Sequence, residues 1–165
     1  MKNWLRIKLV DPLFALLRQG IAPNRLALGV AIGIVVGNVP ILGVSTVLCG
    51  VIALAFRLNL AAIQLVQAAM APTQIVLIIP FVRLGEWIMR APRQPLSIKA
   101  GMALLAGGAG HAIVVLWDAI VHAAVAWVLV APLAVLLFYK LLTPVFARAA
   151  QRLTDRGLRR VPIVP

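Results

Sequence analysis

The chain has 165 residues, of which 63% are hydrophobic and only 12% are charged, and its net charge is +12. A soluble domain carries roughly 45–50% apolar and about 25% charged residues, and a domain of about 150 residues still exposes roughly 30% of its unfolded-chain surface. A chain of this length cannot bury so many apolar side chains in its own core. The composition therefore excludes an ordinary soluble domain and predicts an integral membrane protein.

The placement of the charges argues against a nucleic-acid partner. Most of the basic residues stand at the ends of the apolar stretches: Lys2, Arg6, Lys8, Arg18, Arg25, Arg90, Arg93, Lys99, Lys140, Arg148, Arg152, Arg156, Arg159 and Arg160. This is the pattern of the positive-inside rule, and it predicts cytoplasmic termini. Basic residues in these positions also favour binding to an anionic lipid surface, and each contributes roughly 1 kcal/mol to the binding free energy. The predicted partner is the lipid bilayer, with anionic lipids preferred.

Residues 1–22 are predicted to form an interfacial amphipathic segment. Leucines at positions 5, 9, 13 and 16 fall on one helical face, and polar residues fall on the other. Asp11-Pro12 is a suitable N-cap and first-turn pair, so a second short helix is expected to begin there. The expected role is an anchor lying on the bilayer, with a partner-binding helix as the alternative.

Residues 23–140 are predicted to be the membrane-embedded helical domain, and the first apolar unit in it must break. Arg25 and Arg57 enclose 31 residues without a formal charge. A straight helix of that length would be about 46 Å long, against a hydrocarbon core of about 30 Å. Gly37-Asn38-Val39-Pro40-Ile41-Leu42-Gly43 supplies the break, because proline removes a backbone donor and glycine permits unusual backbone. A re-entrant hairpin is a plausible result.

The second apolar unit, Leu60–Met89, repeats this layout around a break at Ala71-Pro72-Thr73-Gln74. His111–Tyr139 then predicts either one long tilted span or a hairpin that turns near Trp117–His122. Thr143-Pro144 is expected to begin a last helix, so residues 141–165 are predicted to be a basic cytoplasmic tail. The predicted fold is all-α.

The first break and its surroundings resemble a bacterial family of unknown function, the domain-of-unknown-function family "twenty sixty-two". The resemblance is carried by Pro23 through Gly43, by Arg57-Leu58-Asn59, and by the second break with the downstream Pro80 and Leu84-Gly85. It implies a small protein of the bacterial inner membrane, in a family where some members are fused to glycosyltransferase-type domains. The family has no assigned activity, so no catalytic residue is implied. Where such proteins often have Asn-Pro at the second break, this chain has Ala-Pro.

Three groups of residues are candidates for function. Polar groups at or near the breaks form a candidate polar site, because irregular backbone at membrane depth must be buried in protein or line a wet cavity: Asn38, Pro40, Thr46, Asn59, Thr73 and Gln74. Small residues at GxxxG spacing predict close helix packing: Gly29, Gly33 and Gly37. Ionisable residues inside apolar stretches should find partners: Glu86 with an arginine, and Asp118 with His122.

Each group has a simpler structural reading. The amides can satisfy broken backbone without binding anything, the glycines can pack within the chain, and the ionisable residues can form structural pairs. No metal or other cofactor is expected, although His111, Asp118 and His122 share a helical face. An enzyme is not expected either, because no combination of acid, base and nucleophile is complete.

Two functions are consistent with the sequence. One is a structural or scaffolding membrane module that packs through the Gly29, Gly33 and Gly37 face and holds a partner or a second copy of itself. The other is a small transporter or lipid-handling protein with a polar site where the broken helices meet.

Overall fold

The computed structural model describes residues 11–41, 43–93 and 117–158. Within these ranges the chain forms helices and turns without a strand, which confirms the all-α prediction. The helices are α2 (Asp11–Arg18), α3 (Pro23–Val36), α4 (Val44–Ala55), α5 (Leu60–Ala69), α6 (Ala71–Met89) and α9 (Trp117–Leu158). The expectations for residues 2–10, for His111 and for Arg159 and Arg160 lie outside the described residues.

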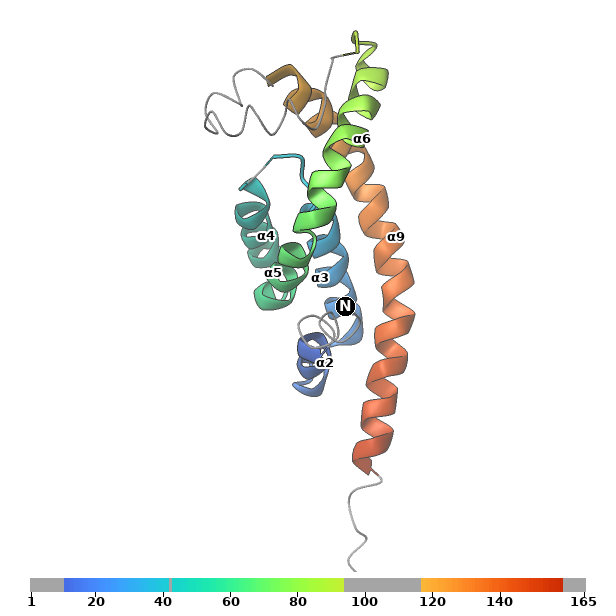
Figure 1. Cartoon of the computed structure of the whole chain (residues 1–165). Coiled ribbons are helices and arrows are strands. Elements are labelled where there is room, and N and C mark those ends of the chain that lie inside the picture. The colour runs from blue at the N-terminus through green and yellow to red at the C-terminus, as the bar shows by residue number, and fades with distance from the viewer. Residues whose placement is uncertain (1–10, 42, 94–116, 159–165) are drawn as a thin grey trace, which may run out of the picture.

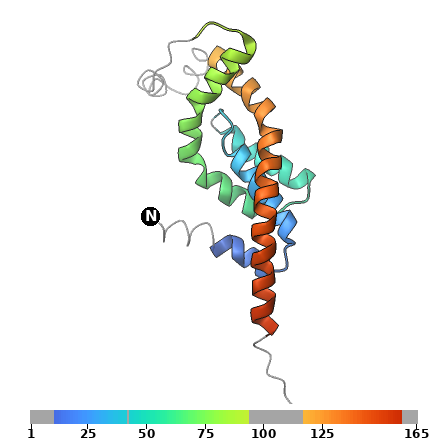
Figure 2. The same ribbon diagram turned by 90° about the vertical axis from the view of Figure 1, so that its right-hand side faces the viewer.

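The helices form an elongated bundle along α9 (Figures 1 and 2). The end that holds α2 and the C-terminal end of α9 is called the lower end, and the opposite end is called the upper end. Helix α3 rises from the lower end, α4 returns toward it, α5 and α6 lead to the upper end, and α9 descends along α3 and α6. Both ends of the α3–α4 hairpin therefore lie on the lower side.

The first predicted break is the turn of this hairpin. Helix α3 ends at Val36, and the amides of Asn38 and Val39 bond to carbonyls only three residues back, which tightens the last turn. Gly43 then precedes α4 as its N-cap residue at φ +86°, a left-handed conformation that glycine adopts without steric cost. The local sequence thus produces a chain reversal at the predicted position.

The second predicted break is a joint rather than a hairpin. Met70 alone separates α5 from α6, and its backbone is close to helical at φ −83° and ψ −7°. Pro72 stands in the first turn of α6, where its missing amide donor costs nothing. The chain changes direction between α5 and α6 but continues toward the upper end (Figure 2). The sequence left open whether this second broken unit is re-entrant as well, and the joint at Met70 shows that it is not.

The C-terminal part is one helix. Helix α9 has 42 residues and contains Pro132 and Pro144 without ending at either. The alternative of a hairpin turning at Trp117–His122 is wrong, because α9 begins at Trp117 and runs through His122. The predicted new helix at Thr143 is also wrong, so the proposed boundary at residue 141 falls within α9. Contacts with α3 and α2 along this half of α9 outweigh the local signal of Thr143-Pro144.

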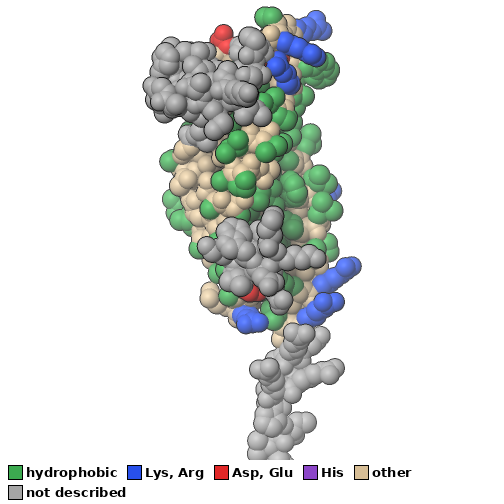
Figure 3. All heavy atoms as spheres, in the orientation of Figure 1, with side chains coloured by type: hydrophobic (Ala, Val, Ile, Leu, Met, Phe, Trp, Pro, Cys, Tyr) green, Lys and Arg blue, Asp and Glu red, His purple; other side chains and the backbone are tan. Residues whose placement is uncertain are grey.

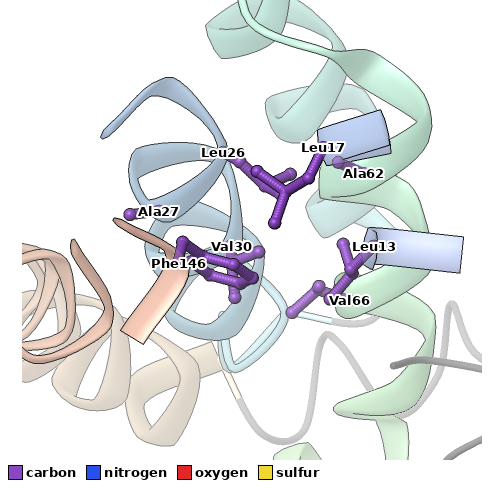
Figure 4. Close-up of a cluster of buried hydrophobic side chains, with 8 residues drawn as sticks. All are labelled: Leu13, Leu17, Leu26, Ala27, Val30, Ala62, Val66 and Phe146. Carbon is purple, nitrogen blue, oxygen red and sulfur yellow. The ribbon is translucent and has the colours of Figure 1, made fainter. Parts of the chain in front are cut away.

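Helix α2 includes Asp11 and Pro12, and its apolar face is not left for lipid. Leu13 and Leu17 are buried in a cluster shared by α2, α3, α5 and α9 (Figure 4). In the close-up the Leu13 side chain lies near Val66 of α5, and the Leu17 side chain lies near Leu26 of α3 and Ala62 of α5. For residues 11–18 the expected bilayer anchor is instead a helix packed onto the bundle.

Much of the molecular surface is apolar. In Figure 3 the Lys and Arg side chains gather toward the upper and lower ends, and hydrophobic side chains dominate between them. Large exposed apolar residues on α4 and α9 include Val47, Val51, Leu54, Leu133 and Leu137. Two helical segments among the described residues, Ala71–Met89 and Trp117–Thr154, are long and apolar enough to cross a membrane.

Candidate polar site at the tip of the hairpin

The free carbonyls at the end of α3 are bonded by side chains. The Asn38 Nδ2 group donates to the Ile34 carbonyl at 2.7 Å, and the Gln74 Nε2 group donates to the Val39 carbonyl at 2.6 Å. Asn38 and Gln74 are each only 7% exposed. Helix ends leave carbonyls without helical partners, and a buried carbonyl without a donor is costly. The two predicted breaks therefore meet, and their amides satisfy backbone groups.

A third donor comes from α9. The Trp127 indole Nε1 donates to the Val35 carbonyl at 3.1 Å, across 92 positions of sequence. The sequence reasoning missed Trp127 in this role. The available signal was that a tryptophan inside an apolar span needs an acceptor for its N–H group.

The start of α4 is held to α5 in the same manner. The Gln67 Nε2 group donates to the Ser45 hydroxyl oxygen at 3.0 Å, and the Gln64 Nε2 group donates to the Thr46 carbonyl at 3.1 Å. With the bonds at the end of α3, these contacts tie both sides of the turn to the rest of the bundle. Ser45 was not among the predicted site residues, although it is 3% exposed and directly bonded.

The candidate polar site is therefore divided. Asn38, Pro40 and Gln74 are buried at the hairpin tip, and Thr46 contributes its backbone there while its side chain is exposed. Asn59 lies at the other end of α4, where its Oδ1 atom accepts from the Ala62 amide and caps α5. Thr73 is exposed on the first turn of α6.

One polar atom at the tip has no partner among the described residues. The Asn38 Oδ1 atom is buried and receives no hydrogen bond. Exchanging the oxygen and nitrogen of the amide would set Oδ1 against the Ile34 carbonyl oxygen, so this assignment is required chemically. The atom is an acceptor available to a water molecule or to a donor on a ligand.

The glycine face of α3 is covered by α5 of the same chain. A Cβ atom on Gly33 would lie 2.9 Å from the Ile63 carbonyl oxygen, and one on Gly37 would lie 2.9 Å from the Met70 Cβ atom. A Cβ atom on Gly29 would make an ordinary contact of 3.5 Å with Ile63. This face therefore packs within the molecule, which corrects its assignment to a partner in the scaffold hypothesis.

The predicted ionisable residues lie toward the upper end. Glu86 is 2% exposed and pairs with Arg83, with 2.8 Å between Oε2 and Nη1. The His122 Nδ1 group donates to the Asp118 backbone carbonyl at 2.5 Å, not to its carboxylate as expected, and Asp118 is exposed. Within the described ranges no three His, Cys, Asp or Glu side chains lie close enough together to hold a metal ion.

Helices α6 and α9 approach each other closely at Gly85. A Cβ atom there would lie 1.9 Å from the His122 carbonyl oxygen. Beside this crossing, a surface cavity of about 930 Å³ is lined by Arg83, Glu86, Trp87 and Arg90 among others. The upper end thus combines a tight helix crossing with a basic rim.

Comparisons with known proteins identify the family but no activity. A family model described as an uncharacterized protein conserved in bacteria (DUF2062) matches residues 9–154. The match confirms the resemblance seen in the sequence. No curated protein and no solved structure matches the chain.

Proposed function

We propose that this chain, which belongs to the bacterial DUF2062 family, is a polytopic protein of the bacterial inner membrane with a structural role. In this proposal α5–α6 and α9 cross the bilayer and the α3–α4 hairpin re-enters it from the cytoplasmic side. Three observations support this proposal. They are the length of the apolar stretches, the positions along α9 at which the other helices contact it, and the exposed apolar surface.

The apolar length of α9 matches a bilayer. Asp118 and Lys140 bracket residues 119–139, which are 21 positions without Asp, Glu, Lys or Arg. This stretch is about 32 Å long, close to the hydrocarbon thickness of about 30 Å. Only 17% of the most apolar 18-residue window is buried inside the protein. A core helix of a soluble protein would be mostly buried, whereas a span facing lipid is not.

The contacts of α9 set the depth of the hairpin. Trp127 lies about 12 Å along α9 from Ala119, the first residue of the charge-free stretch, and so it is near the middle of that stretch. Its side chain bonds to Val35 at the end of α3. Helix α4 has 12 residues and is about 18 Å long. Its descent from the turn therefore brings Arg57 to about the same depth in the bilayer as Lys140. These lengths support a hairpin that reaches the midplane and returns.

Helices α5 and α6 together make the second crossing. Gln74 lies at the hairpin tip, and Gly85 meets His122 about 5 Å below the upper limit of the charge-free stretch. Leu60, at the start of α5, is about 15 Å from the joint at Met70. Two crossings and one re-entrant hairpin leave α2 and the C-terminal end of α9 on the same side.

The charge distribution supports the cytoplasm as that side. The lower end carries these exposed basic residues: Arg18, Arg25, Arg57, Lys140, Arg148 and Arg152. The upper end carries Arg83, Arg90 and Arg93, the first of which is paired with Glu86. An excess of Lys and Arg on short cytoplasmic segments is the positive-inside pattern.

The structural role rests on one observation, which is that the donors at the hairpin tip are already in use. The side-chain nitrogens of Asn38 and Trp127 each donate to a carbonyl in the last turn of α3, and that of Gln74 donates to the Val39 carbonyl in the turn that follows. Such bonds stabilise the closed hairpin, whereas groups that line a transport pathway would face a cavity. Among the described residues, surfaces open to a partner include the exposed apolar faces of α4, α6 and α9 and the basic lower end, whereas α5 covers the glycine face.

Reporter fusions test the proposed arrangement. A phosphatase that is active only in the periplasm is joined after Arg93 or after Gln151 in a bacterial host. Activity is expected after Arg93 and not after Gln151. Equal activity at both positions, or recovery of the untagged chain in the soluble fraction, would overturn the arrangement.

The unpartnered Asn38 Oδ1 atom favours a second candidate, a transporter or lipid-handling protein that holds a polar group at the tip. Asn38→Asp and Asn38→Leu in a strain that depends on this protein distinguish the two. A structural role predicts that loss of function follows loss of folded protein. Loss of function with folded protein at the wild-type level would favour the polar site.

A further inference from the structure

A cavity of about 470 Å³ lies at the lower end, between the start of α3 and the connection from α4 to α5. Its lining includes Arg25, Arg57 and Asn59, with Ile21 and Leu58 as apolar walls. The Arg25 Nη1 group donates to the Arg57 carbonyl at 3.4 Å, which places the two arginines at the same opening. Two segments separated by 32 positions are therefore brought together around two guanidinium groups.

Neither guanidinium has a carboxylate partner within the described part of the chain, where the ion pair is Arg83–Glu86. Two cations beside one cavity repel each other unless an anion lies between them. The guanidinium group presents a planar set of donors that matches phosphate oxygens in a bidentate manner. The cavity is therefore complementary to a phosphoryl group.

The backbone at Arg57 adds an independent observation. Arg57 has φ +52° and follows the end of α4, where the Leu58 amide bonds back to the Ala53 carbonyl at 2.9 Å. This is the helix-ending position at which glycine is preferred, because a side chain is strained there. Glycine would close the same turn with less strain, so Arg57→Gly removes the guanidinium group without a cost to the backbone.

The depth of the cavity fits the headgroup layer. Arg57 lies near the level of Lys140, where the charge-free stretch of α9 ends. Arg25 precedes Leu26, which packs in one cluster with Phe146, and so it lies slightly farther toward the lower end. The polar headgroup layer occupies the several ångströms outside the hydrocarbon core. Basic pockets between membrane helices on this side are suited to anionic headgroups.

We propose that Arg25 and Arg57 form a binding site for the phosphoryl group of an anionic phospholipid of the cytoplasmic leaflet. The phosphate would bridge the two guanidinium groups, and the acyl chains would follow the exposed apolar face of α4, which includes Val51 and Leu54. This site rests on the proposed membrane placement, and it gives the structural protein a specific lipid partner.

The test measures lipid binding to detergent-solubilised protein by native mass spectrometry and by the shift in Tm. The probes are phosphatidylglycerol, phosphatidylcholine and inorganic phosphate at matched ionic strength. The variants are Arg25→Gln, Arg57→Gln and Arg57→Gly. Arg148→Gln is the matched control, because it removes an equal charge from the lower end without touching the cavity.

Phosphatidylglycerol is expected to bind wild-type protein more tightly than phosphatidylcholine does. Each of the three variants at Arg25 and Arg57 should weaken its binding about tenfold, since bonds to charged groups are the strong ones. The control Arg148→Gln should keep affinity within about twofold of wild type, as expected for a weakly coupled surface charge. The glycine variant should keep or raise Tm while losing the lipid, which separates binding from folding.

Two results would overturn the proposal. Equal weakening by Arg148→Gln would mean that the lower end attracts anions only through its net charge. Binding of inorganic phosphate without binding of phosphatidylglycerol would assign the site to a soluble phosphoryl compound and remove the lipid. Fractionation of the same preparations reports separately on membrane insertion, so an inserted protein without arginine-dependent binding contradicts this site alone.

Discussion

Substitution of Gly85 by alanine tests the packing of the two long helices most sharply. The added Cβ atom would lie 1.9 Å from the His122 carbonyl oxygen and 2.3 Å from its carbonyl carbon. Ordinary C···O contacts begin at about 3.3 Å, so α6 and α9 must separate by about 1.4 Å. The obstacle is backbone, which cannot rotate away as a side-chain tip can.

The consequence extends to the neighbouring cluster of Val82, Ala119 and Ala123, which are at most 4% exposed. A gap of about 0.5–1 Å already removes a quarter to a half of the dispersion energy of a contact. Together with the strain of overpacking, the expected loss in the free energy of unfolding is about 3 kcal/mol.

The assay is reversible unfolding in mixed detergent micelles, with Gly50→Ala as the matched control. Gly50 also lies within a helix, and a Cβ atom there would meet nothing within 4 Å. Its substitution should leave stability unchanged or raise it by up to about 1 kcal/mol. The reasoning is refuted if Gly85→Ala and Gly50→Ala have the same stability.

Three further predictions use the same assay. Gly33→Ala should lower the free energy of unfolding by about 1–2 kcal/mol, because its Cβ atom would lie 2.9 Å from atoms of α5. Gly29→Ala should be nearly neutral, because its Cβ atom would lie 3.5 Å from Ile63. Equal effects of the two substitutions would contradict the packing described. Gln74→Leu should cost about 1–2 kcal/mol because the buried Val39 carbonyl loses its donor, and a silent substitution would mean that this bond is absent. Leu17→Ala should cost about 2–4 kcal/mol, since Leu17 is 8% exposed in the core of Figure 4, whereas a negligible effect would favour a helix lying on lipid.

The sequence predicted what is encoded locally. The turn at Gly37–Gly43 follows from residues that disrupt helix. It did not predict that α4 would fold back while α6 would not, because each direction depends on partners distant in sequence. The bond from Gln74 to Val39 and the bond from Trp127 to Val35 are examples.

The errors at the C-terminus have the same origin. Thr143-Pro144 carries the local signal of a helix start, yet Phe146, just beyond it, is buried against α3 at 6% exposure. That contact is retained only if α9 continues. The Thr143 hydroxyl donates to the Tyr139 carbonyl at 2.7 Å instead of capping a new helix. The close approach at Gly85 was likewise invisible, because a single glycine does not identify the backbone that will face it.

The central claim, a hairpin that enters the membrane from the cytoplasm and stops near the midplane, is tested most directly by cysteine labelling. Single cysteines replace Val44 at the hairpin tip, Arg93 at the upper end or Gln151 at the lower end, in a chain carrying Cys49→Ala. With a membrane-impermeant maleimide, Arg93→Cys should label in spheroplasts, Gln151→Cys only in inverted vesicles, and Val44→Cys in neither until the membrane is dissolved. Labelling of Val44→Cys in spheroplasts would show that the hairpin crosses completely and would contradict the account.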